Sequence, residues 1–205
     1  MEARAPRAPI ATIALTSAAV AAALAPDVAA SLELDRGALL SGQWWRLATC
    51  HLAHFGARHA AYDVTLLALL GAWCELRYRG ATHLVLAAAV VLVPLAVLAC
   101  EPHLTSYRGL SGLGSALFAL AATDLALDRR ATDTVVLVGT SALVLLAAKV
   151  AIEVASSGSA LFAHGPHVVA RRRTAAGALL GIAAALLGRV GSDRREITVG
   201  GAACS

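Results

Sequence analysis

The stretch Gly109-Leu110-Ser111-Gly112 places a hydroxyl between two glycines at the start of a long apolar run. Glycine has no Cβ, so backbone or ligand atoms can approach the Ser111 hydroxyl closely. The pattern predicts a serine nucleophile at the beginning of a membrane span. Close helix packing is the alternative, because small residues line most contacts between membrane helices.

A serine nucleophile needs a base within hydrogen-bond reach and donors for the oxyanion. Candidate bases lie after the first apolar run and before the last one: His51, His54, His59, His164 and His167. His59 and Asp63 are four residues apart, so they share one face of a helix. They either support the serine chemistry or bond each other at the membrane interface. Lys149 and Glu153 repeat this spacing, which predicts an intrahelical ion pair that neutralises two costly charges.

The composition indicates the elements that must position these residues. The 205 residues are 59% hydrophobic and 15% charged, whereas soluble domains are about a quarter charged. Six apolar runs are each close to the roughly 20 residues that cross a bilayer: 9–25, 59–74, 81–100, 109–127, 132–155 and 175–190. We therefore expect an all-α membrane protein, a bundle of six transmembrane helices. Residues 9–190 form its membrane domain, between a cytoplasmic N-terminus (1–8) and a cytoplasmic charged tail (191–205).

The first run could also be a signal peptide, since two arginines precede it and Ala23-Leu24-Ala25 imitates a cleavage site. An uncleaved first span is favoured, because the rest of the chain has the pattern of one integral membrane bundle. The net charge of +4 comes from arginines at span ends, which favours a topology signal over a nucleic-acid surface. The four cysteines form no CxxC pair, so neither a zinc site nor a disulfide framework is expected.

Arginine placement predicts the orientation. If six spans alternate, one side of the membrane receives most of the arginines that flank them: Arg4, Arg7, Arg77, Arg79, Arg129, Arg130, Arg189, Arg194 and Arg195. The positive-inside rule makes that side cytoplasmic. Ser111 and the long first loop, with Trp44 and Trp45 at headgroup level, then face outward. The triplet at 171–173 is the exception to the pattern.

Several segments together resemble the rhomboid family of intramembrane serine proteases. They are the stretch from Trp45 to His54, the pair His59 and Asp63, the stretch from Tyr107 to Gly112, and the stretch from Gly177 to Gly181. Within that family the chain is most similar to the rhombosortase branch, which has a six-span core. Lys149 to Glu153 and Gly158 to Phe162 add to this likeness, which covers about residues 40–188.

The resemblance implies roles for the site residues. Ser111 would be the nucleophile, and its backbone amide, with a polar group of the second span, would stabilise the oxyanion. His59 matches the family's second-span histidine, and Asp63 stands where many rhomboids carry asparagine. Gly109 and Gly112 would support the serine. An ionised aspartate would repel an oxyanion, so Asp63 would have to be protonated to donate directly.

The sixth span departs from the family pattern, in which a histidine precedes the glycines that correspond to Gly177 and Gly181. Thr174 occupies that histidine's position, and a threonine is no useful base near neutral pH. His167 could substitute only if residues 167–174 fold back, because seven helical residues span about 10 Å and proton transfer needs about 3 Å.

The resemblance thus implies a rhombosortase-like intramembrane serine endopeptidase. Its substrate would be a secreted protein with a membrane-anchored C-terminal sorting segment that carries small residues, a span and a basic end. The alternative is a rhomboid pseudoprotease that binds membrane segments without cleavage, because of Thr174. A local irregularity of the sequence around 165–174 is a third interpretation. The expected partners are the lipid bilayer and the substrate's transmembrane segment, with no nucleic acid, metal or organic cofactor. The expected location is a bacterial inner membrane, with the active site toward the outer side.

Overall fold

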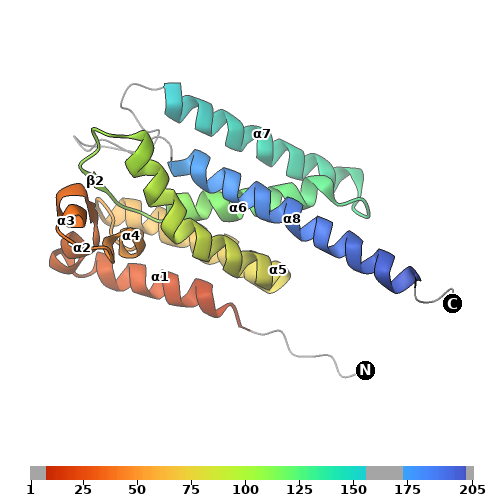
Figure 1. The fold of residues 1–205 in the computed structure, drawn as a ribbon, viewed down its shortest axis with the longest axis horizontal. Helices are drawn as coiled ribbons and strands as arrows, with labels where there is room; N and C mark the ends of the chain where they lie inside the picture. Colours follow the sequence, from red (N-terminus) through yellow and green to blue (C-terminus); the bar gives the residue numbers. More distant parts are fainter. Residues whose placement is uncertain (1–7, 156–172, 202–205) are drawn as a thin grey trace.

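The structure is a computed structural model that describes residues 8–155 and 173–201, with side chains to residue 188 (Figure 1). The described elements are, in chain order, α1 (Ile10–Ala23), α2 (Pro26–Leu32), β1 (Leu34–Asp35), α3 (Arg36–Leu40), α4 (Arg46–Thr49), α5 (Ala57–Cys100), β2 (Ser106–Tyr107), α6 (Ser111–Leu127), α7 (Asp133–Ala155) and α8 (Arg173–Gly201). The predicted all-helical membrane class is confirmed in this mostly helical fold, whose two-residue strands form one small ladder.

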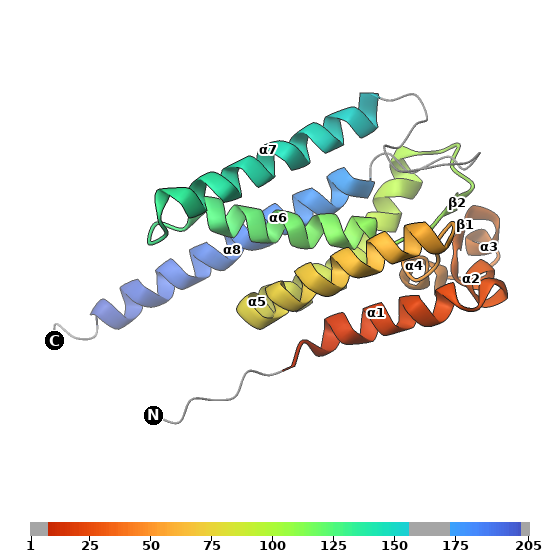
Figure 2. The same cartoon turned by 180° about the vertical axis from the view of Figure 1, so that it is seen from behind.

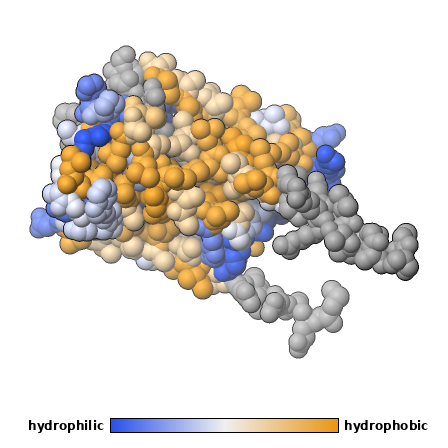
Figure 3. Space-filling model, viewed as in Figure 1, coloured by the Kyte–Doolittle hydropathy of each residue, from blue (hydrophilic) through white to orange (hydrophobic). Residues whose placement is uncertain are grey.

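The long helices run along the molecule's long axis, while α2, α3, α4 and the ladder gather at one end (Figures 1 and 2). Helix α6 is the central element, and most of its residues are buried, among them Leu113, Ala116 and Leu117 at 0% exposure. Leucines on the surrounding helices are exposed instead, such as Leu69 on α5 and Leu145 on α7. Figure 3 shows a largely hydrophobic surface along the helices, with hydrophilic residues toward the ends. Such an apolar exterior suits contact with lipid.

Two helices, α5 and α7, are long and apolar enough to cross a membrane on their own, and the bent pair α1–α2 makes a third candidate. Helix α6 and the 173–188 part of α8 are shorter apolar helices. The 44 residues of α5 would extend about 66 Å if straight, twice the thickness of a hydrocarbon core. Tyr78 is non-helical (φ −129°, ψ 44°), and the helix folds back there into two arms (Figures 1 and 2). The count of six spans stays a prediction.

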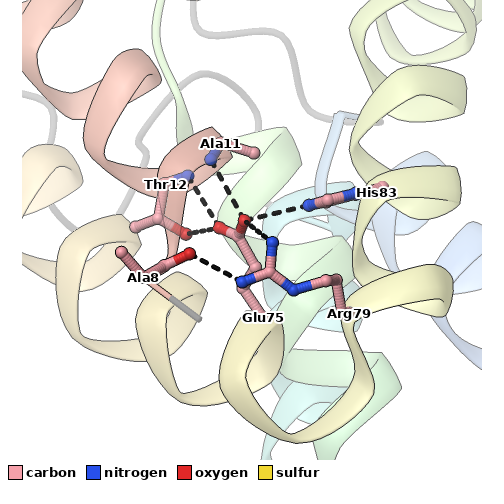
Figure 4. A network of polar contacts seen from close by, with 6 residues as sticks. All are labelled: Ala8, Ala11, Thr12, Glu75, Arg79 and His83. Carbon is pink, nitrogen blue, oxygen red and sulfur yellow. Dashed lines mark hydrogen bonds and ion pairs between the residues drawn. The ribbon is translucent and has the colours of Figure 1, made fainter. Parts of the chain in front are cut away.

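The fold-back of α5 is fixed by a buried carboxylate (Figure 4). Glu75 is fully buried and accepts hydrogen bonds from the amides of Ala11 and Thr12, at 3.1 and 2.9 Å, and from the Thr12 hydroxyl at 2.9 Å. The N-terminal end of α1 therefore faces a negative charge, as the helix dipole favours. His83 Nε2 lies 2.9 Å from the same carboxylate. Helix α1, from the first apolar run, is thus joined to α5 by hydrogen bonds, and its retention as an uncleaved span stays a prediction.

One boundary matches the apolar runs and one differs from them. The charged stretch after residue 74 contains the break at Tyr78 that separates the two arms of α5, and Arg79 there donates to the Ala8 carbonyl at 2.6 Å. In contrast, α8 continues to Gly201 instead of ending near 190. Hydropathy marks where a segment leaves an apolar environment, and a helix can continue past that point through its own backbone hydrogen bonds.

Candidate functional site

Ser111 is the first residue of α6, where the amides of the first helical turn have no partner within the helix. Its Oγ is buried and makes no hydrogen bond within the part of the chain that the structure describes. Gly109, two residues earlier, has a φ of 111°, a backbone conformation that residues other than glycine rarely adopt. The motif therefore forms a turn that places the Ser111 hydroxyl, without a hydrogen-bond partner among the described residues, at the positively polarised N-terminus of α6.

The segment before Ser111 is held by the loop that follows α1 and α2. Strand β1 pairs with β2 in antiparallel register, with Leu34 opposite Tyr107. Arg108 forms an ion pair with Glu33, and the Gly109 amide donates to the Cys50 carbonyl at 3.1 Å. No pattern in the sequence predicts this ladder, because two-residue strands carry no periodic signal.

His51 contacts the backbone of the turn that precedes Ser111. It is 1% exposed, and its Nδ1 and Nε2 lie 3.3 and 3.1 Å from the carbonyls of Gly109 and Val90. Burial lowers the pKa of His51 from 6.5, although the two carbonyls partly oppose that shift. Tyr107, whose pKa is raised by burial, donates its hydroxyl to the same Gly109 carbonyl at 3.4 Å. His51 is a structural support for the turn, a role that the sequence did not reveal.

Cys50 is no alternative nucleophile, although it adjoins His51. Burial raises the pKa of its thiol to about 12, so the sulfur stays protonated. Its Sγ donates to the Leu47 carbonyl at 3.4 Å.

Asp63 lies between two histidines, His54 and His59, beside the turn. Its Oδ2 is 3.3 Å from His59 Nε2 and 3.4 Å from His54 Nε2, which are ion-pair distances, and it makes no hydrogen bond to any described residue. The Asp63 and His54 side chains are 10% and 1% exposed, and that of His59 is 27% exposed. The structure thus brings the predicted i, i+4 pair together.

The pair lies directly against the turn that carries the serine. A Cβ placed on Gly109 would sit 3.0 Å from Asp63 Oδ2 and 3.2 Å from His59 Cε1. Only a glycine therefore lets the carboxylate and the imidazole come this close to the backbone before Ser111.

On the other side, glycines bring α8 close to α6. A Cβ on Gly177 would lie 2.1 Å from the Gly112 carbonyl oxygen, and one on Gly181 would lie 2.0 Å from that of Ala116. Thr174 precedes them by three and seven residues, so it occupies the same face of α8 one turn nearer to the Ser111 end. The sequence-predicted position at 174 therefore lies on the wall of α8 that faces α6.

Thr174 is fully buried, and its hydroxyl accepts a hydrogen bond from Lys149 Nζ at 2.9 Å. Lys149 also pairs with Glu153, which confirms the predicted ion pair on α7. The link from Lys149 to α8 was missed, since it joins residues 25 positions apart and depends on helix packing alone. His164 and His167 lie outside the described residues.

In residues 8–155 and 173–201, no group of three or more His, Cys, Asp and Glu side chains is arranged to hold a metal ion. The site has three parts. Ser111 lies at the N-terminus of α6, and the His59–Asp63 pair lies against the turn that precedes it. The third part is the Thr174 hydroxyl of α8, which accepts a hydrogen bond from Lys149 of α7.

Comparison with known proteins assigns the chain to a family. Residues 41–191 match the family model of the rhomboid domain. No curated protein matches the chain. The family match covers Ser111, the His59–Asp63 pair and α8 up to residue 191, so the chain belongs to the rhomboid family, whose members are generally intramembrane serine proteases.

Proposed function

We propose that this rhomboid-family protein is an intramembrane serine endopeptidase with Ser111 as its nucleophile. The observation that carries the proposal is the Ser111 hydroxyl itself, which is buried at a helix N-terminus and has no hydrogen-bond partner among the described residues. A buried polar group without a partner costs free energy. Such a cost is expected where the group is kept for chemistry.

The helix end supplies the electrostatics that acyl transfer needs. The amide of Ser111 lies in the first turn of α6, where the helix dipole favours a developing negative charge. We expect this amide to stabilise the oxyanion, with Gly109 and Gly112 leaving room for the substrate backbone. His59 and Asp63 are proposed to belong to the same site.

A fluorophosphonate probe tests the nucleophile, because it labels only an activated serine. We expect the purified protein to be labelled and Ser111→Ala to lose all labelling. Ser41→Ala, which removes an exposed hydroxyl bonded to the Ala38 carbonyl, should label like the wild type. Labelling that persists in Ser111→Ala would contradict the assignment. A parallel loss in His167→Ala would support that residue as the base.

The proposed substrate follows the rhombosortase likeness: a secreted protein whose C-terminal segment carries small residues, a span and a basic end. Exposed Trp44 and Trp45 would lie at the membrane surface beside the entry to the site. Co-expression with a reporter that bears such a tail should give a product that is lost with Ser111→Ala. A reporter cleaved equally well without its small-residue segment would exclude this substrate class.

A pseudoprotease is the second candidate, and one observation favours it. Thr174, at the position of the family's histidine, is bonded to Lys149 and is no base. In that case the protein would bind the tail peptide with unchanged affinity in wild type and Ser111→Ala, and neither would be labelled. Binding measured with a fluorescent tail peptide in detergent distinguishes the two functions.

A further inference from the structure

The described part of the chain offers few histidines that could accept a proton from Ser111. Both ring nitrogens of His51 face backbone carbonyl oxygens. Those of His54 face the Leu52 carbonyl at 3.1 Å and the Asp63 carboxylate at 3.4 Å. Both imidazoles are enclosed, at 1% exposure for His51 and for the His54 side chain. Neither can turn a lone pair to the serine without breaking its contacts.

His59 differs from these two residues. Its Nε2 lies 3.3 Å from Asp63 Oδ2, while its Nδ1 makes no hydrogen bond to any described residue. Its side chain is 27% exposed and is stacked on the Phe55 ring at 6.1 Å with an interplanar angle of 4°. The imidazole is therefore held on one edge by a carboxylate and open on the other.

The position of His59 suits a base for Ser111. Its Cε1 and Nε2 would lie 3.2 and 3.4 Å from a Cβ on Gly109, and Ser111 follows Gly109 by only two residues. Because Gly109 has no side chain, the imidazole can lie directly against the backbone of the serine turn. Hydrogen bonds of a catalytic site often form only in the complex with substrate, so an open apo arrangement is compatible with this role.

On the opposite side of the site, where Thr174 of α8 contacts Lys149 of α7, the described residues offer no base. Thr174 cannot hold a proton near neutral pH, and Lys149 Nζ is engaged by the Glu153 carboxylate and the Thr174 hydroxyl. Because Lys149 donates to the Thr174 hydroxyl, this side of the site presents hydrogen-bond donors. The chain thus lacks the family's histidine on α8 and carries a carboxylate, in place of asparagine, beside the histidine on α5.

We propose that these two differences compensate each other, and that His59 is the general base for Ser111, with Asp63 as the residue that positions it. Nδ1 of His59 takes the Ser111 Oγ proton as Oγ bonds to the scissile carbonyl carbon and that carbonyl's π electrons move to its oxygen. The tetrahedral intermediate collapses, the C–N bond breaks, and His59 returns the proton to the leaving amine. Water then attacks the acyl-enzyme: His59 takes a water proton and passes it to Ser111 Oγ, which releases the carboxylic acid.

Asp63 contributes when His59 is protonated. The imidazolium and the buried carboxylate then form an ion pair, which is strong where water is excluded. This role differs from oxyanion donation, for which an ionised aspartate is unsuited because it would repel the developing charge. The inference rests on the proposed function, since it requires Ser111 to be the nucleophile.

Asp63→Asn separates the two roles, because many rhomboids carry asparagine there and its amide is a competent donor. We expect the first-order rate of fluorophosphonate labelling at saturating probe to fall by up to about 10⁴-fold, the loss known when the carboxylate that orients a catalytic imidazole is replaced by an amide. The apparent affinity for the probe should not change. Asp128→Asn at the far end of α6 is the matched control and should leave the rate unaltered.

A second variant guards against misfolding. Thr174→His in the Asp63→Asn background restores the family's pair of residues, and we expect it to recover at least a tenfold faster rate than Asp63→Asn alone. An Asp63→Asn protein that labels as fast as the wild type would overturn the inference, as would a rate that falls together with the melting temperature and is not rescued. A wild type without any labelling would instead refute the proposed function.

Discussion

His51 shows how one buried side chain ties the site to pH. Its imidazole contacts the carbonyl of Gly109, so the turn before Ser111 depends on it. Burial lowers its pKa below 6.5, which means that the folded state resists a proton that the unfolded chain accepts. The stabilisation is therefore complete above pH 6.5 and is lost as the pH falls below that value.

We expect the melting temperature in detergent to fall between pH 7.5 and pH 5.5. Below pH 6.5 this residue lowers the free energy of unfolding by up to about 1.4 kcal/mol per pH unit. His51→Gln should be less stable at pH 7.5 but show a shallower pH dependence. His103→Gln, in the exposed loop after α5, should keep the wild-type slope. An equal slope in wild type and His51→Gln would show that another group causes the loss.

Single residues were predictable where helix geometry alone decides their contacts. The pairs His59–Asp63 and Lys149–Glu153 follow from a spacing of four on a helix, and both are present. The bond between Lys149 and Thr174 was not predictable, because the register of α7 against α8 arises from packing. His51 was only one of several histidines in a loop, and no pattern in the sequence distinguished it as the support for Gly109.

At the scale of elements, the site depends on how closely α8 approaches α6. Gly177 and Gly181 lie against backbone atoms of α6, and a Cβ at either position would come within 2.1 Å of a carbonyl oxygen. Backbone cannot yield as a flexible side chain can, so the two helices would have to separate. Such a shift would move Thr174 away from the Ser111 end of α6.

Gly177→Ala should therefore destabilise the protein by about 2 kcal/mol, within the range for overpacked cores, and reduce probe labelling of Ser111. Gly188→Ala on the same helix is the control. Its Cβ would meet no atom within 4 Å, so it should be neutral or stabilise by up to about 1 kcal/mol through helix propensity. Thermal unfolding followed by circular dichroism in detergent compares the two. Equal melting temperatures would show that the helices pack less closely than described.

Across the whole molecule, hydropathy predicted which segments are helices but not how far they continue. Glu75 and Arg79 were expected to end a span, and α5 does fold back between them at Tyr78, but α8 continues to Gly201, past its apolar run. The sequence did not reveal that α1 supplies amide donors for the Glu75 carboxylate and a carbonyl for the Arg79 guanidinium. The pairing of β1 with β2 also escaped prediction, since its register depends on the loop and the Ser111 turn meeting in space. Local composition cannot encode such partners.

The arrangement of arginines leads to a prediction about the whole molecule in its membrane. His103 lies in the loop that leads to Ser111, and Arg129 follows the opposite end of α6, about 25 Å away along 17 helical residues. Both residues are exposed. If the positive-inside rule holds, the Arg129 end is cytoplasmic and the His103 end faces outward with the serine.

In a background with all four cysteines replaced, a membrane-impermeant maleimide applied to intact bacterial spheroplasts should label His103→Cys and leave Arg129→Cys unlabelled. After permeabilisation both should react, which controls for exposure of the two thiols. The reverse pattern would place Ser111 toward the cytoplasm, where a secreted protein's tail could reach it only before export. The substrate proposed above requires the outward orientation, so this experiment tests the topology and the accessibility of the site to that substrate together.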